Sequence, residues 1–308
     1  MSVKSEYLGI DTSNYTTSVA LLSPNGMESR RKLLPVKEGE RGLRQSDAVF
    51  LHTKQLPDLI ESLPSPVQPS AVGVSTRPRS VEDSYMPCFL TGQGVARAIA
   101  HLYDCPLYEF SHQQGHIAAG LWSAGREDLF GQRILAFHVS GGTTELLLVN
   151  GMDDIRVICH TVDLHAGQLI DRIGVLLGYP FPCGAHMDAD ACRAEHPLRP
   201  TVRLKDGCCS LSGYENKAKK MLKDGVSRDE IAYFAINTVA SQLQGMIDYA
   251  LSLYPDLPLL MIGGVCSNTI IRRRLSDRYG ALFAADGFSC DNAAGIAVLA
   301  KLRHEGSF

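Results

Sequence analysis

The segment Leu8–Leu22, LGIDTSNYTTSVALL, decides the fold. It starts with apolar residues, passes through a short polar cluster and ends in a second apolar run. This order predicts a strand, a tight turn and a second strand. The same order returns at Leu135–Val149, LAFHVSGGTTELLLV, so the sequence contains the predicted hairpin twice.

The two segments also correspond at single residues. Ser13 matches Ser140 and Thr17 matches Thr144, and both pairs are 127 residues apart. A repeat at this distance is too long for a solenoid and indicates a duplicated domain. We therefore expect two lobes of similar fold.

Small polar residues fill both predicted turns. Their hydroxyls and closely approachable backbone amides can bind an oxyanion. Two such turns facing one cleft would clamp the phosphates of a nucleotide, whereas either turn alone is also typical of an ordinary hairpin.

Between the two hairpins, Ala71–Ser75 is predicted to be a buried strand. Thr91–Tyr103 has helical periodicity, with Val95, Ile99 and Leu102 on one face.

In the second half, Ser227 and Glu230 form a capping box at the start of a long helix that ends near Leu253. A short apolar strand, Leu257–Ile262, then leads directly into Gly263. Because strands alternate with helices in both halves, the sequence predicts an α/β fold.

Composition is that of an ordinary globular protein, with 45% hydrophobic and 20% charged residues. No segment approaches the roughly 20 apolar residues that span a bilayer, and we expect a cytoplasmic protein without membrane contact. The net charge of -3 argues against nucleic-acid binding through the overall field, and the basic run Arg272–Arg274 is typical of a solvated helix face. The cysteines contain no CxxC pair and are predicted to be reduced and structural: Cys88, Cys105, Cys159, Cys183, Cys192, Cys208, Cys209, Cys266 and Cys290.

A candidate metal site begins with His112 and His116 in SHQQGHIAAG, whose spacing puts both imidazoles on one helical face. His138 precedes the second turn, and Asp291 opens the last predicted helix. Three imidazoles and one carboxylate would suit a divalent ion such as iron or zinc. The alternatives are surface histidines for the HxxxH pair and, for His138, a buried strand histidine bonded to backbone.

Candidate nucleotide contacts lie in the second half. Asp171 would lie on a helix within reach of the cleft, unless it is an exposed carboxylate paired with Arg172. Gly263, Gly264 and Asn268 form a turn between strand and helix, where a purine could stack on bare backbone or where glycines serve packing alone. Another polar loop contains Ser210, Ser212 and Gly213.

Taken in order, these segments resemble the TsaD family of tRNA threonylcarbamoyladenosine transferases, once labelled M22 peptidases. The resemblance covers nearly the whole chain. His112–His116 is similar to the family motif HMEGH, Val139–Glu145 to VSGGHTQ and Asp163–Arg172 to DDAAGEAFDK. Three further matches follow: Ser210–Gly213 to FSG, Gly263–Asn268 to GGVAAN and Cys290–Asn292 to TDN.

The resemblance implies a two-lobed, duplicated RNase H-like fold of the sugar kinase, Hsp70 and actin type, with lobes at 1–131 and 132–308. It implies bound ATP or an acyl-adenylate, and a metal at His112, His116 and Asp291. His138 stands where some members have a tyrosine ligand. The residues that would contact the nucleotide or its phosphates are Ser13, Ser140, Gly141, Gly142, Thr143, Asp171, Gly184, Gly263, Gly264 and Asn268. Implied partners are tRNA and a homologous or small partner protein.

The chain departs from the family at several motifs. The acidic motif TSCDET is replaced by TSNYTT at 12–17, and a glycine-rich GPGLVGAL turn by Arg77–Val81, RPRSV. Gln168 replaces the glutamate of GEAFDK, and Thr143 the histidine of GGHTQ.

Three functions remain open. The first is transfer of a threonylcarbamoyl-type group, in which an amine such as adenine N6 attacks an activated carbonyl. The second is a divergent paralogue that binds nucleotide and metal but has another acceptor, which Arg77 and Arg79 could recognise, or serves as a non-catalytic partner. A metallopeptidase is poorly supported, because Gln113 occupies the place of the general-base glutamate of HExxH.

Overall fold

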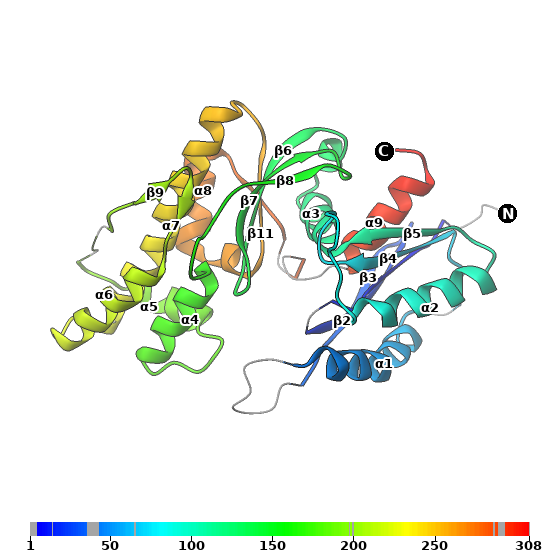
Figure 1. The fold of residues 1–308 in the computed structure, drawn as a ribbon, viewed down its shortest axis with the longest axis horizontal. Coiled ribbons are helices and arrows are strands. Elements are labelled where there is room, and N and C mark those ends of the chain that lie inside the picture. Colours follow the sequence, from blue (N-terminus) through cyan, green and yellow to red (C-terminus); the bar gives the residue numbers. More distant parts are fainter. Residues whose placement is uncertain are drawn as a thin grey trace. The chain divides into compact units, whose positions relative to one another are not determined.

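The computed structural model describes residues 5–13, 15–35, 43–64, 66–196, 198, 200–285, 287–288 and 293–307. The described residues fall into two compact units (Figure 1). Unit 1 takes its residues from Met1–Gly131, Gly151–Asp154 and Cys290–Phe308, and unit 2 from Gln132–Asn150 and Ile155–Ser289.

Unit 1 contains a five-stranded sheet in the order β3-β2-β1-β4-β5. Its strands are β1 (Tyr7–Asp11), β2 (Thr16–Ser23), β3 (Gly26–Leu33), β4 (Ala71–Arg77) and β5 (Leu107–Ser111). The first three pair antiparallel, while β4 runs parallel to β1 and to β5. The predicted hairpin and the predicted strand at Ala71 are therefore confirmed.

The helices of unit 1 are α1 (Gln45–Glu61), α2 (Phe89–Leu102), α3 (His112–Ser123) and α9 (Ala293–His304), with a short 3-10 helix η1 (Glu127–Leu129). Helix α2 is present as predicted, and two of the residues expected on one of its faces, Val95 and Ile99, pack against the core. Leu102 is 79% exposed, while Ala96 and Ala100 are buried. Small residues allow the helix to approach the sheet closely, so periodicity of the large apolar residues alone does not define its inner face.

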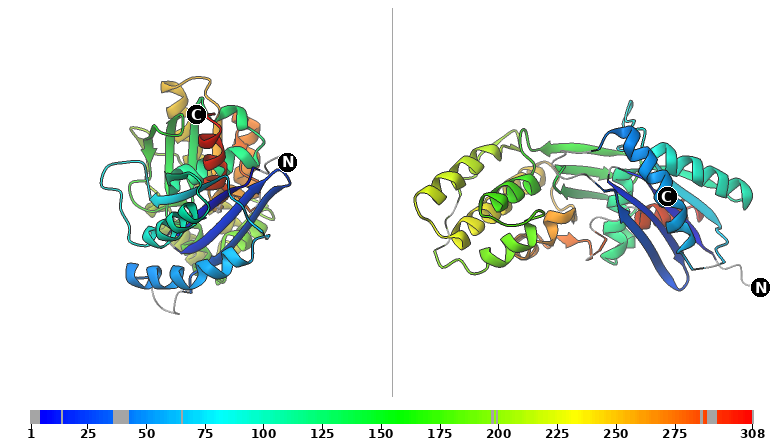
Figure 2. Two further views of the ribbon diagram at one scale, coloured as in Figure 1. Left: turned by 90° about the vertical axis from the view of Figure 1, so that its right-hand side faces the viewer. Right: turned by 90° about the horizontal axis from the view of Figure 1, so that it is seen from below.

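Helix α9 packs on the sheet of unit 1 through backbone contacts (Figure 2). A Cβ atom at Gly9 of β1 would lie 2.2 Å from the Ala293 carbonyl oxygen, and one at Gly73 of β4 would lie 2.7 Å from that of Ile296. On α9 itself, a Cβ at Gly295 would lie 1.9 Å from the Gly115 carbonyl oxygen of α3. Glycines therefore permit α9 to fit between β1, β4 and α3.

Unit 2 repeats the same sheet, in the order β12-β11-β6-β7-β8. Its strands are β6 (Arg133–Val139), β7 (Thr144–Asn150), β8 (Ile155–His160), β11 (Leu259–Ile262) and β12 (Leu282–Phe283). Again three strands form an antiparallel meander, and two more add parallel to its first strand. The predicted duplication is confirmed, because each strand of unit 1 has a counterpart with the same neighbours.

The other elements of unit 2 are α4 (Ala166–Leu176), α5 (Gly184–Ala191), β9 (Leu204–Lys205), β10 (Cys208–Cys209), α6 (Ser212–Lys223), α7 (Arg228–Leu253), η2 (Gly264–Ser267) and α8 (Thr269–Tyr279). The capping box of α7 is present as predicted: the Ser227 hydroxyl accepts from the Glu230 amide at 3.3 Å. Helix α7 contributes much of the core of this unit, including Phe234, Val239 and Leu243.

Two expectations from composition concern the whole chain. Among the described residues, no helix combines the length and the apolar character needed to cross a membrane. The eight described cysteines are all free thiols, while Cys290 lies outside the described residues.

Substitution Gly295→Ala tests the close packing of α9. A methyl group there would meet the Gly115 backbone, so we expect a loss of about 1–3 kcal/mol in the free energy of unfolding, even though alanine is the better helix former. Urea unfolding followed by circular dichroism measures this difference.

Gly94→Ala is the matched control. Gly94 lies on α2 and has open space where a Cβ would stand. We expect this change to stabilise the protein by roughly 0.5–1 kcal/mol through helix propensity. Equal effects of the two substitutions would contradict the close contact between α9 and α3.

Candidate metal and nucleotide sites

The candidate metal site of unit 1 is held by the junction of β5 and α3. The Ser111 hydroxyl accepts a hydrogen bond from the Gln114 amide at 3.2 Å, and the Gln114 side chain accepts one from the Ser111 amide at 2.6 Å. This capping box fixes the first turn of α3 and therefore the position of His112.

His112 and His116 lie side by side on α3, as their spacing predicts. Their ring centroids are 4.6 Å apart, and His116 is 8% exposed. Within the described residues, no group of three or more His, Cys, Asp or Glu side chains is arranged to hold a metal. Asp291 lies outside the described residues and His138 belongs to unit 2, so the metal remains a prediction.

Asp11, at the end of β1, was not among the predicted site residues. Its carboxylate lies 2.9 Å from His112 Nδ1 and accepts a hydrogen bond from the Ser13 amide at 2.8 Å. Burial disfavours ionisation of this carboxyl, but the charge and hydrogen bond of His112 outweigh it, and the pKa of Asp11 is lowered. A carboxylate bonded to one ring nitrogen orients the other nitrogen, here Nε2, for metal binding. The Ser13 hydroxyl lies 3.5 Å from that Nε2.

The loop that follows β4 lies against the start of α3. The Pro78 carbonyl oxygen accepts from the Gln113 amide at 3.1 Å, and the Ser80 hydroxyl donates to Ser111 at 3.0 Å. The segment that replaces the family's glycine-rich turn, with Arg77 and Arg79, is therefore anchored next to His112.

The second polar turn, Ser140–Thr143, is a tight loop at the end of β6. The Ser140 amide donates to the Thr143 carbonyl at 2.7 Å, and the Gly142 amide donates to the Ser140 hydroxyl at 3.2 Å. Two amides of α4 hold this turn, because Gly167 donates to the Ser140 carbonyl and Ala166 to the Thr144 hydroxyl. The Ser140 and Gly142 amides are therefore used inside the turn, and a phosphate there would be met by its other amides, those of Gly141 and Thr143.

Gly263 lies directly beside the end of β6. It has a φ angle of +99°, and a Cβ there would lie 2.3 Å from the Val139 carbonyl oxygen. Only glycine fits this combination of backbone angle and close approach. The Gly263 turn and the Ser140–Thr143 turn thus lie at the same edge of the sheet.

Asp171 and Gly184 are joined through Cys183. The half-buried carboxylate of Asp171 accepts from the Cys183 amide at 2.8 Å, and Gly184 begins α5. Arg172 pairs instead with Glu215 at 3.2 Å, so the alternative of an Asp171–Arg172 pair is wrong. Burial raises the pKa of Asp171, although the Cys183 amide acts in the opposite direction.

Asp188 of α5 is a second residue that the sequence did not reveal. One carboxylate oxygen accepts from the Thr269 amide at 3.0 Å and from its hydroxyl at 2.7 Å. The other is buried and has no hydrogen-bond partner among the residues that the structure describes. Asn268 precedes Thr269 and caps α8 by accepting from the Ile271 amide at 3.1 Å. A buried carboxylate oxygen without a partner is costly, which marks this place as a candidate for ligand contact.

These contacts form a closed ring in unit 2. The Ser140–Thr143 turn touches α4, α4 is bonded to the start of α5 through Asp171, and α5 is bonded to the start of α8 through Asp188. The short helix η2 begins directly after Gly263 and ends at Asn268. Gly263 in turn lies against the end of β6, which completes the ring. We call this set the unit 2 contact ring. It brings together all of the predicted nucleotide residues of unit 2.

Asp163 organises the other polar loop. Its carboxylate accepts hydrogen bonds from the hydroxyls of Ser210 and Ser212, both at 2.6 Å, and from the Leu211 amide at 2.7 Å. Partial burial works against ionisation, but these donors outweigh it and hold the pKa of Asp163 well below its usual range. Both hydroxyls of the predicted polar loop therefore have a structural role.

Two other predicted positions have a definite place in unit 2. His138 is 9% exposed and pairs in the sheet with Glu145 and Ile262. Gln168 accepts from the His165 amide at 3.3 Å and so caps α4, a role that glutamine fills as well as glutamate.

The fold defines the class of protein. Two units with the same strand order and pairing are the architecture of the sugar kinase, Hsp70 and actin class. The solved structure of full-length HypF, in a phosphate- and nucleotide-bound form, matches with a TM-score of 0.62 at 12% identity. That match covers 98% of this chain and 56% of the HypF chain.

The family follows from the sequence comparisons. The family TsaD, described as tRNA N6-adenosine threonylcarbamoyltransferase, matches residues 70–298, and the chain belongs to this family. A tRNA N6-adenosine threonylcarbamoyltransferase of Thermus thermophilus is 29% identical, over 98% of this chain and 94% of the relative. A probable bifunctional tRNA threonylcarbamoyladenosine biosynthesis protein of Methanothermobacter thermautotrophicus is 26% identical, over 88% of this chain and 49% of the relative.

Asp163→Asn tests the role of the Asp163 carboxylate. The pKa of Asp163 is lower in the folded state than in the unfolded state. The ionised carboxylate therefore stabilises the fold at pH values above its unfolded-state pKa, and this stabilisation is lost as the pH falls towards the folded-state pKa. The carboxylate is exposed, so we expect the variant to be less stable by only about 1 kcal/mol at pH 7. The difference should shrink below about pH 4 in urea unfolding series.

Asp224→Asn provides the matched control, because Asp224 is an exposed residue at the end of α6. Its unfolding curve should follow the wild type at every pH. A pH-independent loss in Asp163→Asn would show that the side-chain shape matters and its charge does not.

Proposed function

We propose that this protein transfers a threonylcarbamoyl-type group from an adenylate to N6 of adenosine in tRNA, in the cytoplasm. The observation that carries the proposal is the unit 2 contact ring. It joins three separate family motifs, although they are spread from Ser140 to Asn268 in the sequence. Membership of the TsaD family supports the same activity.

Each part of the ring has a chemical task in this proposal. The Gly141 and Thr143 amides of the Ser140–Thr143 turn bind the adenylate phosphate. Asp188, with its unpartnered oxygen, accepts a hydrogen bond from a ribose hydroxyl, and Asn268 orients the base. The bare backbone at Gly263 and Gly264 leaves room for the purine.

The reaction needs no protein nucleophile. Adenine N6 attacks the carbamoyl carbon and a C–N bond forms, while the bond between that carbon and the phosphate oxygen breaks so that AMP leaves with the electron pair. N6 releases one proton to solvent in the same reaction. Rate acceleration then depends on positioning and on stabilisation of developing charge. His112 and His116 are the described residues that would hold the metal, and a bound divalent ion would neutralise phosphate charge. Asp11 keeps His112 in the required orientation.

A specific observation favours the second function, a paralogue with another acceptor. The loop after β4 is anchored to α3 at Gln113 and Ser111, so Arg77 and Arg79 are fixed near the candidate metal residues. In the glycine-rich turn of the family motif, small and flexible residues stand at these positions. A planar guanidinium there would favour an anionic acceptor.

A partner protein is part of the proposal. The bifunctional relative from Methanothermobacter thermautotrophicus is about twice as long as the region it shares with this chain. We propose that a separate protein, either a homologue or a small partner, supplies a corresponding contribution here.

A single-turnover assay with threonylcarbamoyl-adenylate and unmodified tRNA tests the function. We expect modified adenosine to form and Asp188→Asn to slow its formation by about 10-fold or more, since a hydrogen bond to a charged group is worth roughly 1.5–3 kcal/mol. Asp190→Asn on the same helix is the control. Adenylate binding without modified tRNA would favour the paralogue, and absence of adenylate binding would refute both functions.

Asp11→Asn tests the metal proposal separately. Removal of a carboxylate that orients a histidine ligand typically lowers metal affinity by about 10- to 100-fold, so we expect a loss of this size by competition with a chelator. His112→Ala combined with His116→Ala should abolish stoichiometric metal in elemental analysis. Asp58→Asn, on the exposed side of α1, should leave both measurements unchanged. Unaltered metal content in the double histidine variant would refute the proposed metal site.

A further inference from the structure

Helix α6 carries exposed positive charge on its outer side. Its buried residues are Ala218 and Met221, whereas Lys220 and Lys223 in its last turn are exposed. In the part of the chain that the structure describes, neither lysine is paired with a carboxylate. Both ammonium groups are therefore open to an external anion.

Arg228 continues this positive charge at the start of α7. Its guanidinium carbon lies 4.5 Å from the ring centroid of Tyr179, and among the described residues no carboxylate is paired with it. An arginine held over an aromatic ring keeps its donors free for the oxygens of a phosphate. The charge of Arg228 is thus fixed in place without being neutralised.

Tyr179 also orients an exposed imidazole. The rings of Tyr179 and His186 are stacked, with centroids 5.6 Å apart and planes 1° from parallel. His186 is exposed on α5, two residues after Gly184 of the predicted nucleotide site. An exposed planar ring in a fixed orientation can stack with an unpaired base. We call the set of Lys220, Lys223, Arg228 and His186 the basic strip.

Most carboxylates near the basic strip are engaged elsewhere. The segment 212–230 contains four carboxylates, and three of them have partners within unit 2: Glu215 with Lys219 at 2.6 Å, Asp229 with Arg193 at 3.2 Å and Glu230 with the Ser227 hydroxyl at 2.9 Å. The fourth, Asp224, is exposed at the end of α6. The three cations of the strip are therefore not neutralised by the nearest carboxylates in the sequence.

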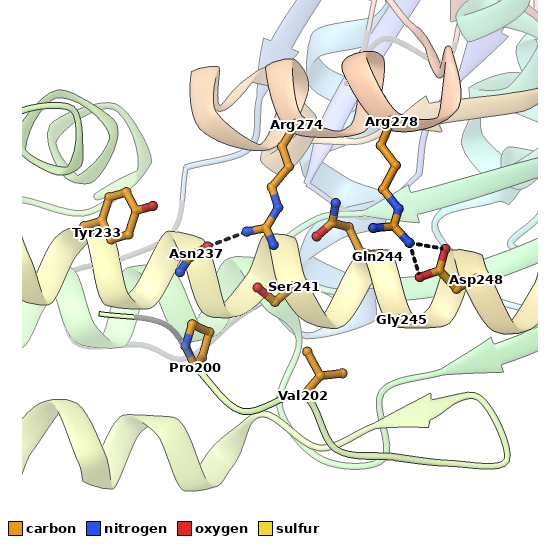
Figure 3. A pocket seen from close by; sticks show the side chains of 10 residues that line it. All are labelled: Pro200, Val202, Tyr233, Asn237, Ser241, Gln244, Gly245, Asp248, Arg274 and Arg278. Carbon is orange, nitrogen blue, oxygen red and sulfur yellow. Dashed lines mark hydrogen bonds and ion pairs between the residues drawn. The ribbon is translucent and has the colours of Figure 1, made fainter. Parts of the chain in front are cut away.

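The arginines of α8 are the opposite case, although the run Arg272–Arg274 is denser in the sequence. Arg274 donates to the amide oxygen of Asn237, and Arg278 is paired with the Asp248 carboxylate at 2.9 Å. Figure 3 shows both contacts beside a pocket that α7 and α8 line. These two arginines bind within the fold, which leaves the basic strip as the better surface for an external anion.

The basic strip lies on the helices that carry part of the unit 2 contact ring. Helix α4, which contains Asp171, packs against both α5 and α6 (Figure 1). Arg172, the next residue on α4, pairs with Glu215 of α6 at 3.2 Å. The same helices therefore position the ring and the strip, so a molecule bound along the strip is held by the unit that would hold the adenylate.

We propose that the basic strip binds tRNA, with Lys220, Lys223 and Arg228 on backbone phosphates and the His186 ring stacked on an unpaired base. Phosphate contacts position a nucleic acid, and aromatic rings bind bases that are not stacked in a duplex. The inference rests on the proposed function, which makes tRNA the acceptor and supplies the polyanion. It adds the surface that holds this acceptor.

Binding of unmodified tRNA without adenylate tests the charges of the strip. Fluorescence anisotropy at a series of salt concentrations gives the affinity and its salt dependence. Lys220→Gln, Lys223→Gln and Arg228→Gln are combined in one variant. We expect the slope of log affinity against log salt to become shallower by about 2, since each phosphate contact contributes roughly 0.7–0.9. Near 0.1 M salt the affinity should fall by about 10-fold or more.

The stacking contact is tested separately. His186→Ala should weaken tRNA binding by about 5-fold or more, as expected for a lost base–aromatic contact, and should leave the salt slope unchanged. His186→Phe keeps a planar ring and should retain the affinity. A uniform loss in both variants would contradict the stacking contact.

Two further variants serve as charge controls. Arg273→Gln removes one positive charge from a side chain that is 85% exposed on α8, and it should leave the tRNA affinity and the salt slope unchanged. Asp224→Asn removes the exposed carboxylate beside Lys223 and should tighten tRNA binding. Adenylate affinity should be the same in all of these variants, which shows that the ring remains folded.

Three results would overturn the proposal. The first is the absence of saturable tRNA binding by the wild type. The second is an unchanged affinity and slope in the triple variant, which would show that the lysines serve only the C-terminal end of α6. The third is an equal loss per charge in Arg273→Gln, which would show that only overall charge matters.

The outcomes also separate this proposal from the proposed function. If the triple variant binds tRNA normally and the wild type forms modified adenosine in the single-turnover assay, the basic strip is refuted and the transferase function stands. If the triple variant loses tRNA binding and the wild type forms no modified adenosine, the transferase function is refuted and the strip stands.

Discussion

Both candidate sites depend on one constraint, the parallel pairing of each hairpin's first strand with a strand that arrives after a crossover. In unit 1, β4 pairs with β1 and β5 pairs with β4, and in unit 2, β11 pairs with β6. Parallel strands end at the same edge of a sheet, so the segments that follow them must meet there. This is why Asp11 reaches His112, and why Gly263 touches the end of β6. The same pairing, repeated after duplication, created two polar edges from one ancestral pattern.

The sequence predicted the parts of the fold that depend on local order. Both hairpins, the capped helix α7 and the strand that ends at Gly263 follow from alternation, capping residues and glycine position. The face of α2 could not be predicted in the same way. Its contact with the sheet uses Ala96 and Ala100, and alanine gives a weak signal because it is common on both faces of helices.

The candidate sites were predicted less completely, because their residues meet through tertiary contacts. Asp11 and His112 are 101 residues apart, and Asp188 and Thr269 are 81 residues apart. No spacing rule connects such pairs. Ser210 and Ser212 belong to a segment that resembles a family motif, and their hydroxyls donate to Asp163 and hold a loop. A motif match identifies where a segment belongs, and the hydrogen bonds decide what each side chain does.

Helix α9 has a consequence for how the protein is made. The ribosome completes the five strands of the first sheet before it reaches unit 2, but the helix that covers Gly9 and Gly73 is translated only after unit 2. Unit 2 is synthesised in between, and it can form its own core first. The nascent chain therefore carries an incompletely covered sheet while unit 2 is being made, a state in which apolar surface is open to chaperones and to aggregation. A premature stop before Ala293 would spare unit 2 and leave the earlier-made unit without its covering helix.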